Sequence, residues 1–172
     1  MADNLFVDRF WEIDALRGLA IIAMIAFHLL FDLRFFAGIG LLPGEAWFLA
    51  PRLIGGTFIF LAGIALTLSK SGPIKRGAKI FSWGLLATAT TYVFLPQGTI
   101  WFGILHFIGL GIIACQPFLR DDALPWAAAA IVAGLWLESL VFSSPWLLWL
   151  GLRPESFYSF DYYPLLPWLG VM

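Results

Sequence analysis

The sequence predicts an all-α, polytopic transmembrane helix bundle with about five full spans and the start of a sixth. Its composition is the first reason, since 61% of the 172 residues are hydrophobic and only 12% are charged. The mean hydropathy of +0.89 lies far outside the range of soluble domains. Long apolar segments alternate with short turns, and no polar stretch is long enough to fold alone. We therefore expect residues 1–172 to form a single transmembrane domain.

The expected helices follow one another along the whole chain. They cover about residues 13–36, 46–69, 79–95, 99–119 and 125–142. Glycine and proline mark the turns, as in the Gly38-Ile-Gly40 stretch that ends the first helix. The last apolar run, residues 164–172, would extend only about 14 Å as a helix, roughly half of a hydrocarbon core. We therefore expect the chain to be either the N-terminal portion of a longer protein or a gene product cut short inside its sixth helix, lacking its C-terminal helices in both cases.

The distribution of Lys and Arg predicts the orientation. A basic cluster, KSGPIKRGAK, follows the second helix, and the positive-inside rule keeps such a cluster in the cytoplasm. Alternation then places the N-terminus inside. The cytoplasmic cations would be Arg9, Lys70, Lys75, Arg76, Lys79 and Arg120, against Arg34, Arg52 and Arg153 on the other side. We expect an integral protein of the cell (inner) membrane, surrounded by lipid.

Charge and motif content exclude several classes of function. A net charge of −1 does not supply the basic surface that nucleic-acid binding needs. The two histidines and one cysteine are scattered over two expected helices, with His28 on the first and His106 and Cys115 on the fourth, so no metal site is predicted. The chain contains no GxSxG elbow, P-loop, dinucleotide fingerprint or HExxH motif. Chemistry must therefore come from ionisable residues within the apolar segments.

Four ionisable residues interrupt the first apolar segment. Arg17 and His28 are separated by about three whole helical turns, so they share one face about 16 Å apart. Asp14 and Asp32 fall within about 40° of the same stripe. Ionisable groups inside a membrane helix are costly and mark functional sites by default. The pattern predicts a shared polar cleft.

The residue types on this stripe indicate proton transfer and anion binding. His28 can take and return a proton near neutral pH, and Asp32, four residues on, can accept the other ring N–H and hold one tautomer. The alternative is a histidine that only bridges helices through a hydrogen bond. Arg17 could bind a phosphate or carboxylate from the inner leaflet. Its alternative is an interfacial arginine paired with Asp14.

Three further residues are candidates for the cleft. His106, which we expect in the middle of the fourth helix, either faces His28 across the cleft or holds helices together. Arg52 and Glu138 either form an ion pair at the outward mouth or extend separately to the interface. The threonines of the third helix are expected to bond backbone carbonyls; they are Thr88, Thr90 and Thr91.

Four blocks of the sequence resemble a known family. They are EIDALRGLAIIAMIAFH, FIFLAGIALTLS, FGILHFIGLGII and DYYPLLPWLG. Their order is similar to that in the short prokaryotic branch of the heparan-alpha-glucosaminide N-acetyltransferase catalytic-domain family, and the IDALRG block is the most specific. An arginine followed after ten residues by a histidine is also the pattern of the wider transmembrane acyltransferase superfamily, carried here by Arg17 and His28.

This resemblance implies a membrane-bound acyltransferase. It would move an acetyl or other acyl group from cytoplasmic acyl-CoA to a sugar hydroxyl or amine on the opposite side of the membrane. Arg17, supported by Asp14, would help to hold the donor, and His28 would be the general base; His106 would be a cleft residue only. In the heparan enzyme the histidine usually regarded as catalytic lies between the first two helices, where this chain has none. The role of His28 therefore follows the wider superfamily.

Two other functions fit the same residues. One is a small transporter or proton-coupled permease, in which the stripe on the first helix relays protons or ions. The other is a truncated, non-catalytic helix bundle of the same fold. A relay needs no donor site, so acetyl-CoA binding separates the first alternative from an acyltransferase. An oligomer is compatible with any of the three.

Overall fold

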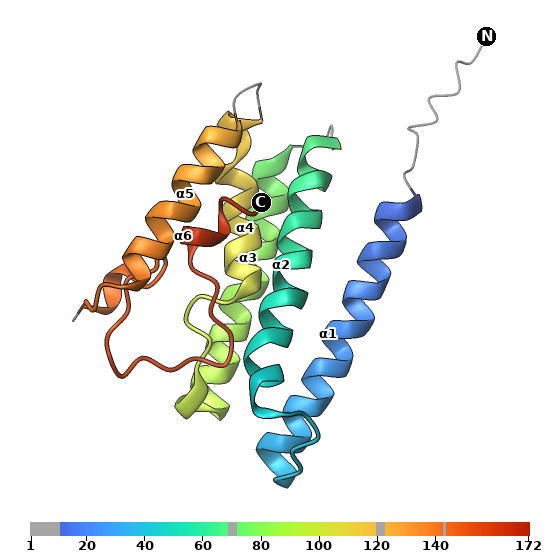
Figure 1. Cartoon of the computed structure of the whole chain (residues 1–172), viewed down its shortest axis with the longest axis vertical. Coiled ribbons are helices and arrows are strands. Elements are labelled where there is room, and N and C mark those ends of the chain that lie inside the picture. Colours follow the sequence, from blue (N-terminus) through green and yellow to red (C-terminus); the bar gives the residue numbers. More distant parts are fainter. Residues whose placement is uncertain (1–10, 69–71, 120–122, 143) are drawn as a thin grey trace. The chain divides into compact units, whose positions relative to one another are not determined.

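A computed structural model describes residues 11–68, 72–119, 123–142 and 144–172 (Figure 1). Helices dominate these residues, and their only strand-like pairings are two isolated bridges, so the all-α class is confirmed. The helices are α1 (Trp11–Ala37), α2 (Gly44–Leu68), α3 (Pro73–Phe94), α4 (Ile104–Ala114), α5 (Ala123–Glu138) and α6 (Leu165–Trp168). Three short 3₁₀ turns connect them: η1 (Pro96–Gly98), η2 (Gln116–Phe118) and η3 (Pro145–Leu147).

Two of the described helices, α1 and α2, are long and apolar enough to cross a membrane. The shorter α4 and α5 are apolar as well. These helices agree with the expected membrane protein, while the number of spans and the side of the N-terminus stay predictions. Of the cations that set the expected orientation, Arg9, Lys70 and Arg120 lie outside the described residues.

The first helix ends where glycine was expected to stop it. Gly38 has a φ of +69°, a left-handed conformation that glycine adopts without strain. The Ile39 N–H then donates to the Leu33 carbonyl at 3.1 Å, which closes the helix end. The chain turns here and enters α2, and Pro51 is accommodated inside that helix.

The fourth helix is much shorter than the predicted range of residues 99–119. It covers Ile104–Ala114 only, because the backbone of Ile100 bonds to side chains of α3 instead of to a helical turn. The Ile100 N–H donates to the Thr91 hydroxyl at 3.0 Å, and the Thr88 hydroxyl donates to the Ile100 carbonyl. Pro117 in η2 follows the C-terminal end of α4. The prediction of a full-length fourth helix was therefore wrong.

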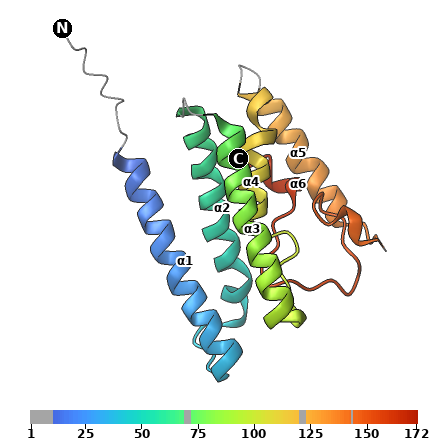
Figure 2. The same ribbon diagram turned by 180° about the vertical axis from the view of Figure 1, so that it is seen from behind.

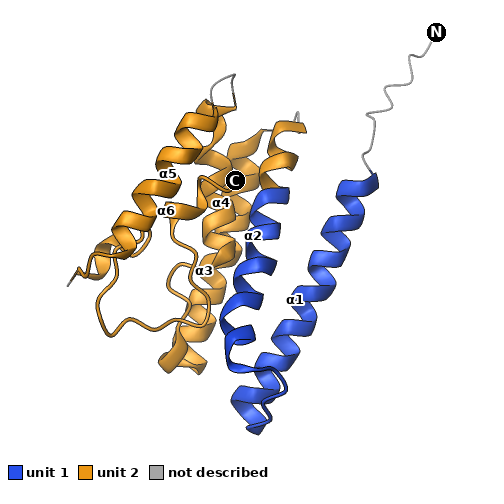
Figure 3. Ribbon diagram, in the orientation of Figure 1, with its two compact units in different colours: residues 1–61 blue, residues 62–172 orange. Residues whose placement is uncertain are grey.

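The described chain divides into two compact units, residues 1–61 and 62–172 (Figure 3). The boundary falls within α2. Figures 1 and 2 show α3 and α4 side by side in the second unit. Glycines allow this approach, since a Cβ added at Gly77 would lie 2.6 Å from the Gly109 carbonyl oxygen. That residues 1–172 form one domain stays a prediction.

Candidate functional site

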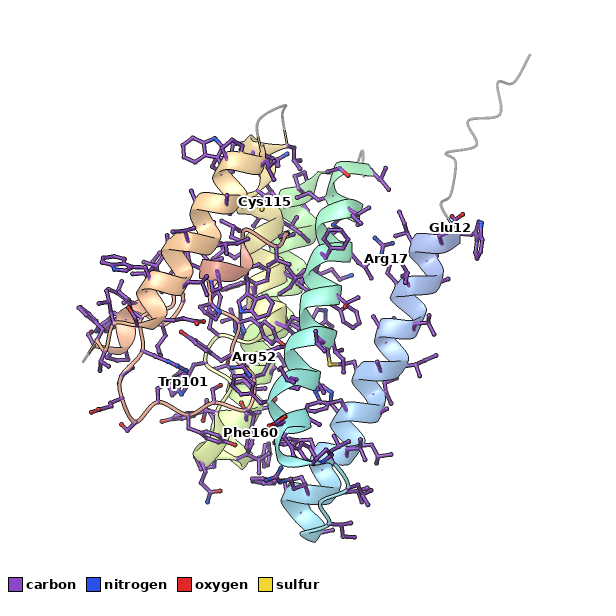
Figure 4. All side chains as sticks on the ribbon, viewed as in Figure 1. Glu12, Arg17, Arg52, Trp101, Cys115 and Phe160 are labelled. Carbon is purple, nitrogen blue, oxygen red and sulfur yellow. The ribbon has the colours of Figure 1, made fainter. Side chains whose placement is uncertain are left out.

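The first turns of α1 carry an ion pair. The Arg17 guanidinium donates to the Asp14 carboxylate at 3.4 Å, and the two side chains are 37% and 57% exposed. Glu12 and Asp14 lie in the first turn, where the helix dipole favours negative charge. Figure 4 shows Glu12 and Arg17 at the same end of α1. The structure therefore shows the expected pairing with Asp14 and leaves the guanidinium accessible to a further anion.

His28 lies on the exposed side of the same uninterrupted helix. Its Nδ1 lies 2.8 Å from the Met24 carbonyl oxygen, one turn earlier. A carbonyl only accepts, so Nδ1 must carry a proton, and in the neutral ring Nε2 then has a free lone pair. Nε2 has no hydrogen-bond partner among the described residues. The arrangement is that of an oriented imidazole with one unused basic nitrogen.

Asp32 does not make the contact expected of it. Its side chain is exposed, and the structure contains no hydrogen bond between Asp32 and the His28 ring, both of which are described. The expectation overlooked a local competitor, because the backbone carbonyl of Met24 is also within reach of the ring N–H. In this structure Met24, rather than Asp32, orients the imidazole. A catalytic role for Asp32 stays a prediction.

His106 lies in a buried polar cluster of the second unit, and the residue is only 2% exposed. Nδ1 accepts a hydrogen bond from the Gly103 N–H at 3.2 Å, and Nε2 lies 3.2 Å from the Thr88 hydroxyl oxygen. That hydroxyl donates its proton to Ile100, so it must accept from the Nε2–H of His106. Both ring nitrogens are therefore occupied.

The position of His106 corrects a second expectation. It lies in the first turn of α4, three residues after Gly103, and not in the middle of a helix. Gly84 of α3 lies directly against it, since a Cβ there would be 2.9 Å from the imidazole. The ring stacks on Phe102 at a centroid distance of 5.6 Å. These contacts favour the helix-joining alternative for His106.

Asp161 is the polar residue that the sequence analysis missed. Its carboxylate accepts the Ile104 N–H at 2.8 Å, across a separation of 57 residues. Ile104 begins α4, and the preceding Gly103 has no side chain that could cap the helix. Asp161 therefore supplies the N-terminal cap from a distant segment. The available signal was an acidic residue at the start of the DYYP motif, in an otherwise aromatic and apolar context.

Residues around Asp161 form a strap across the start of α4, which we call the 159–163 strap. The Ser159 hydroxyl donates to the Thr99 carbonyl at 2.9 Å. The Phe160 N–H donates to the Gly98 carbonyl at 3.2 Å, and the Tyr163 N–H donates to the Phe102 carbonyl at 2.8 Å. These bonds satisfy backbone groups that a longer α4 would have bonded internally.

The two remaining candidates, Arg52 and Glu138, have other neighbours. Arg52 donates to the Phe48 carbonyl of its own helix at 2.9 Å. Glu138 is the last residue of α5 and interacts electrostatically with Tyr162. The Tyr162 hydroxyl donates to the Leu148 carbonyl at 2.8 Å. Burial raises the pKa of Tyr162 to about 12, an effect that Arg153 opposes and Glu138 reinforces. A pairing of Arg52 with Glu138 stays a prediction.

The threonines of α3 are placed as expected. Thr90 donates to the Leu86 carbonyl and Thr91 to the Ala87 carbonyl, each at 2.8 Å and each one turn earlier. Thr88 differs because its hydroxyl donates to the Ile100 carbonyl and accepts the Nε2–H of His106. The prediction that these hydroxyls satisfy backbone carbonyls is confirmed.

Comparison with known proteins identifies the family. The family model described as heparan-alpha-glucosaminide N-acetyltransferase, catalytic, matches residues 9–172. No curated protein and no solved structure matches the chain. The matched range contains every candidate site residue, from Asp14 to Glu138, and also Asp161. The chain therefore belongs to the heparan-alpha-glucosaminide N-acetyltransferase catalytic-domain family, a family of membrane acetyltransferases.

Proposed function

We propose that the protein transfers an acetyl group from cytoplasmic acetyl-CoA to a sugar hydroxyl or amine on the opposite side of the membrane. The observation that carries the proposal is the hydrogen bond between His28 Nδ1 and the Met24 carbonyl. It fixes the proton on Nδ1, so Nε2 is available as a base. Membership of an acetyltransferase family supports the reaction class.

In this proposal His28 moves one proton. Nε2 accepts the proton of the acceptor hydroxyl or amine while the acceptor oxygen or nitrogen attacks the thioester carbonyl. The carbon–sulfur bond breaks, and the imidazolium returns the proton to the departing CoA sulfur. The Met24 carbonyl orients the ring throughout the cycle, as the partner of Nδ1. The acid–base cycle closes on a single residue.

Arg17 is the proposed donor-binding residue. Its ion pair with Asp14 is exposed, and exposed pairs of this kind contribute only about 0.2–1 kcal/mol. A doubly charged phosphate can therefore share or replace the carboxylate at low cost. Enzymes of this family use acetyl-CoA as donor in general, and the CoA moiety carries such phosphates. Arg17 and His28 lie about 16 Å apart along α1, which an extended pantetheine arm can span.

The surroundings of His106 argue against it as the base. Both of its ring nitrogens are occupied, by the Gly103 N–H and by the Thr88 hydroxyl. To accept a substrate proton, the ring would first have to break one of these bonds, which would leave a buried polar group unpaired at a cost of about 1–3 kcal/mol. His28 requires no such step.

Acetyl-CoA binding to the purified chain in neutral detergent tests the proposal. We expect micromolar to millimolar binding by isothermal titration calorimetry, weakened about 10- to 100-fold by Arg17→Ala because a charged hydrogen bond is lost. Arg153→Ala, which removes an exposed arginine from the second unit, is the matched control and should bind like the wild type. Unchanged binding by Arg17→Ala would remove Arg17 from the donor site. No binding by the wild type would favour the proton-relay alternative.

A further inference from the structure

Two lysines lie side by side at the start of α3. Every lysine of the chain falls within residues 70–79, and the two that the structure describes, Lys75 and Lys79, belong to the first two turns of this helix. They are four residues apart, so they lie about 40° apart around the helix, with Cβ atoms about 6 Å from each other. Both residues are exposed. One face of α3 therefore presents two neighbouring ammonium groups.

This basic face lies on the side of α3 opposite its contact with α4. Gly84, which lies directly against the His106 ring, is nine residues after Lys75 and hence about 180° around the helix from it. Gly77, which lies against the Gly109 carbonyl, is about 200° from Lys75 in the same sense. The glycines thus fix which side of α3 packs on α4, and the two lysines lie on the other side.

Apolar side chains continue the same face along α3. Leu86 lies eleven residues after Lys75, only about 20° from it around the helix, and is 52% exposed. Trp83 lies one turn after Lys79 and is 57% exposed. Along the helix axis Leu86 lies about 10 Å beyond Lys79, while the hydrocarbon of one leaflet is about 15 Å deep. The face therefore changes from cationic to apolar within the depth of one leaflet.

The positive charges of this face repel one another in the isolated helix. Like charges four residues apart destabilise a helix, and a cation in the first turn opposes the helix dipole. The first turn of α3 contains Lys75 and Arg76 and no acidic residue. Among the described residues, no carboxylate forms an ion pair with Lys75 or Lys79. An anion from outside the chain would relieve this repulsion.

We propose that the face formed by Lys75, Lys79, Trp83 and Leu86 binds an anionic phospholipid. The headgroup phosphate contacts the two ammonium groups, and an acyl chain follows the apolar side chains toward the middle of the membrane. Lysine attracts a phosphate as a compact point charge. A free anion would use only the basic end of this face, whereas a phospholipid uses both ends. The surface is distinct from the proposed donor site, because Arg17 belongs to the first unit.

Thermal unfolding of the purified chain in dodecyl maltoside tests the surface. The probes are dioleoyl phosphatidylglycerol, dioleoyl phosphatidylcholine and inorganic phosphate. We expect phosphatidylglycerol to raise the Tm more than phosphatidylcholine does, and this difference should shrink as salt is added. Inorganic phosphate should raise the Tm less than phosphatidylglycerol, because it buries no apolar surface. Equal shifts from the two lipids, or a shift from inorganic phosphate that matches phosphatidylglycerol, would overturn the proposal.

Variants of the two lysines locate the response. Lys75→Gln/Lys79→Gln should bind phosphatidylglycerol about 30-fold more weakly, at about 5-fold for each lysine removed. Lys75→Arg/Lys79→Arg keeps both charges and should keep the response. Arg153→Gln removes an exposed cation elsewhere in the second unit and is the matched control. A double glutamine variant that responds like the wild type would overturn the proposal. If that variant folds poorly, Lys79→Gln alone should show the 5-fold loss.

Acetyl-CoA binding measured on the same samples separates the lipid surface from the donor site. The double glutamine variant should bind acetyl-CoA like the wild type while losing the response to phosphatidylglycerol. A parallel loss of acetyl-CoA binding would assign the two lysines to the donor site and overturn the lipid proposal. A wild type that responds to phosphatidylglycerol but does not bind acetyl-CoA supports the lipid surface and refutes the donor proposal alone.

Discussion

His28 and His106 have the same side chain and similar apolar sequence contexts, yet the structure treats them differently. His28 lies on the exposed side of α1 with one ring nitrogen bonded to Met24 and the other unused. His106 is buried in the second unit, with Gly103 on one nitrogen and Thr88 on the other. Whether a ring nitrogen lacks a hydrogen-bond partner among the described residues therefore indicates which histidine is available for chemistry.

The same contrast extends to the polar residues around each histidine. In the second unit the Asp161 carboxylate accepts the Ile104 N–H, and the Tyr162 hydroxyl donates to the Leu148 carbonyl. These side chains thus bond to backbone groups of other segments. None of the buried polar side-chain atoms among the described residues lacks a partner. On α1, by contrast, Asp14 and Asp32 are exposed. We infer that the buried polar groups of the second unit stabilise the fold, while the exposed polar groups of α1 are available to ligands.

Replacing His28 should have the largest effect. His28→Ala should lower acetyl transfer about 10²- to 10⁴-fold, the usual contribution of a general base. Its unfolding free energy should change by no more than about 0.5 kcal/mol, because the side chain is exposed. Initial rates with radiolabelled acetyl-CoA test this. Asp32→Ala is the matched control, since it removes no hydrogen bond from the ring; an equal loss there would support the orienting role that the sequence predicts for Asp32.

His106→Ala should show the opposite pattern. Removing the ring leaves a cavity and deprives the Thr88 hydroxyl of its donor, so the chain should lose about 2–4 kcal/mol of stability. The remaining folded protein should transfer acetyl at the wild-type rate. Unfolding in mixed micelles of increasing SDS fraction, followed by tryptophan fluorescence, measures the loss of stability. A stable variant with no activity would move His106 into the mechanism and contradict the contrast.

Adding a methyl group between α3 and α4 should lower the stability of the second unit by an intermediate amount. In Gly84→Ala the new Cβ would lie 2.9 Å from the His106 ring, so the helices must separate or the ring must move. Overpacking of this kind costs about 1–3 kcal/mol. Gly40→Ala is the control, because nothing lies within 4 Å of a Cβ there. Equal unfolding midpoints for the two variants would show that the α3–α4 contact is looser than the structure indicates.

Tyr162 should give the smallest effect, and only at high pH. Burial raises the pKa of Tyr162 from 10.0 to about 12, so the folded chain keeps a proton that the unfolded chain has lost. Its contribution to stability is therefore complete below pH 10 and is lost as the pH rises toward 12. Absorbance at 295 nm should show a late tyrosine titration step from Tyr162. Tyr162→Phe should abolish that late step, and a late step that persists would assign it to another tyrosine.

Local features of the fold could be predicted from the sequence. The long α1, its end at Gly38 and the carbonyl bonds of Thr90 and Thr91 depend on residues at most a turn apart. The pairing of Arg17 with Asp14 has the same short range. Periodicity and turn chemistry contain this information directly.

Long-range features could not be predicted in this way. The start of α4 depends on Asp161, which lies 57 residues beyond Ile104, and on hydroxyl groups of α3. Apolar character alone extended the expected helix to residue 99, because hydropathy does not distinguish helical from extended backbone in GTIWFG. The orientation of the His28 ring depends on whether its N–H bonds to the Met24 carbonyl, one turn earlier, or to the Asp32 carboxylate, one turn later. Spacing alone does not decide between them.

The capping of α4 by Asp161 has a consequence for biosynthesis. Ile104 leaves the ribosome well before Asp161 does, since 57 residues separate them. During that interval the newly made α4 has an open first turn, with at least one amide that a nascent chain must satisfy with water or a lipid headgroup. The first turn of α4 therefore reaches its final hydrogen bonding only after the 159–163 strap has been synthesised.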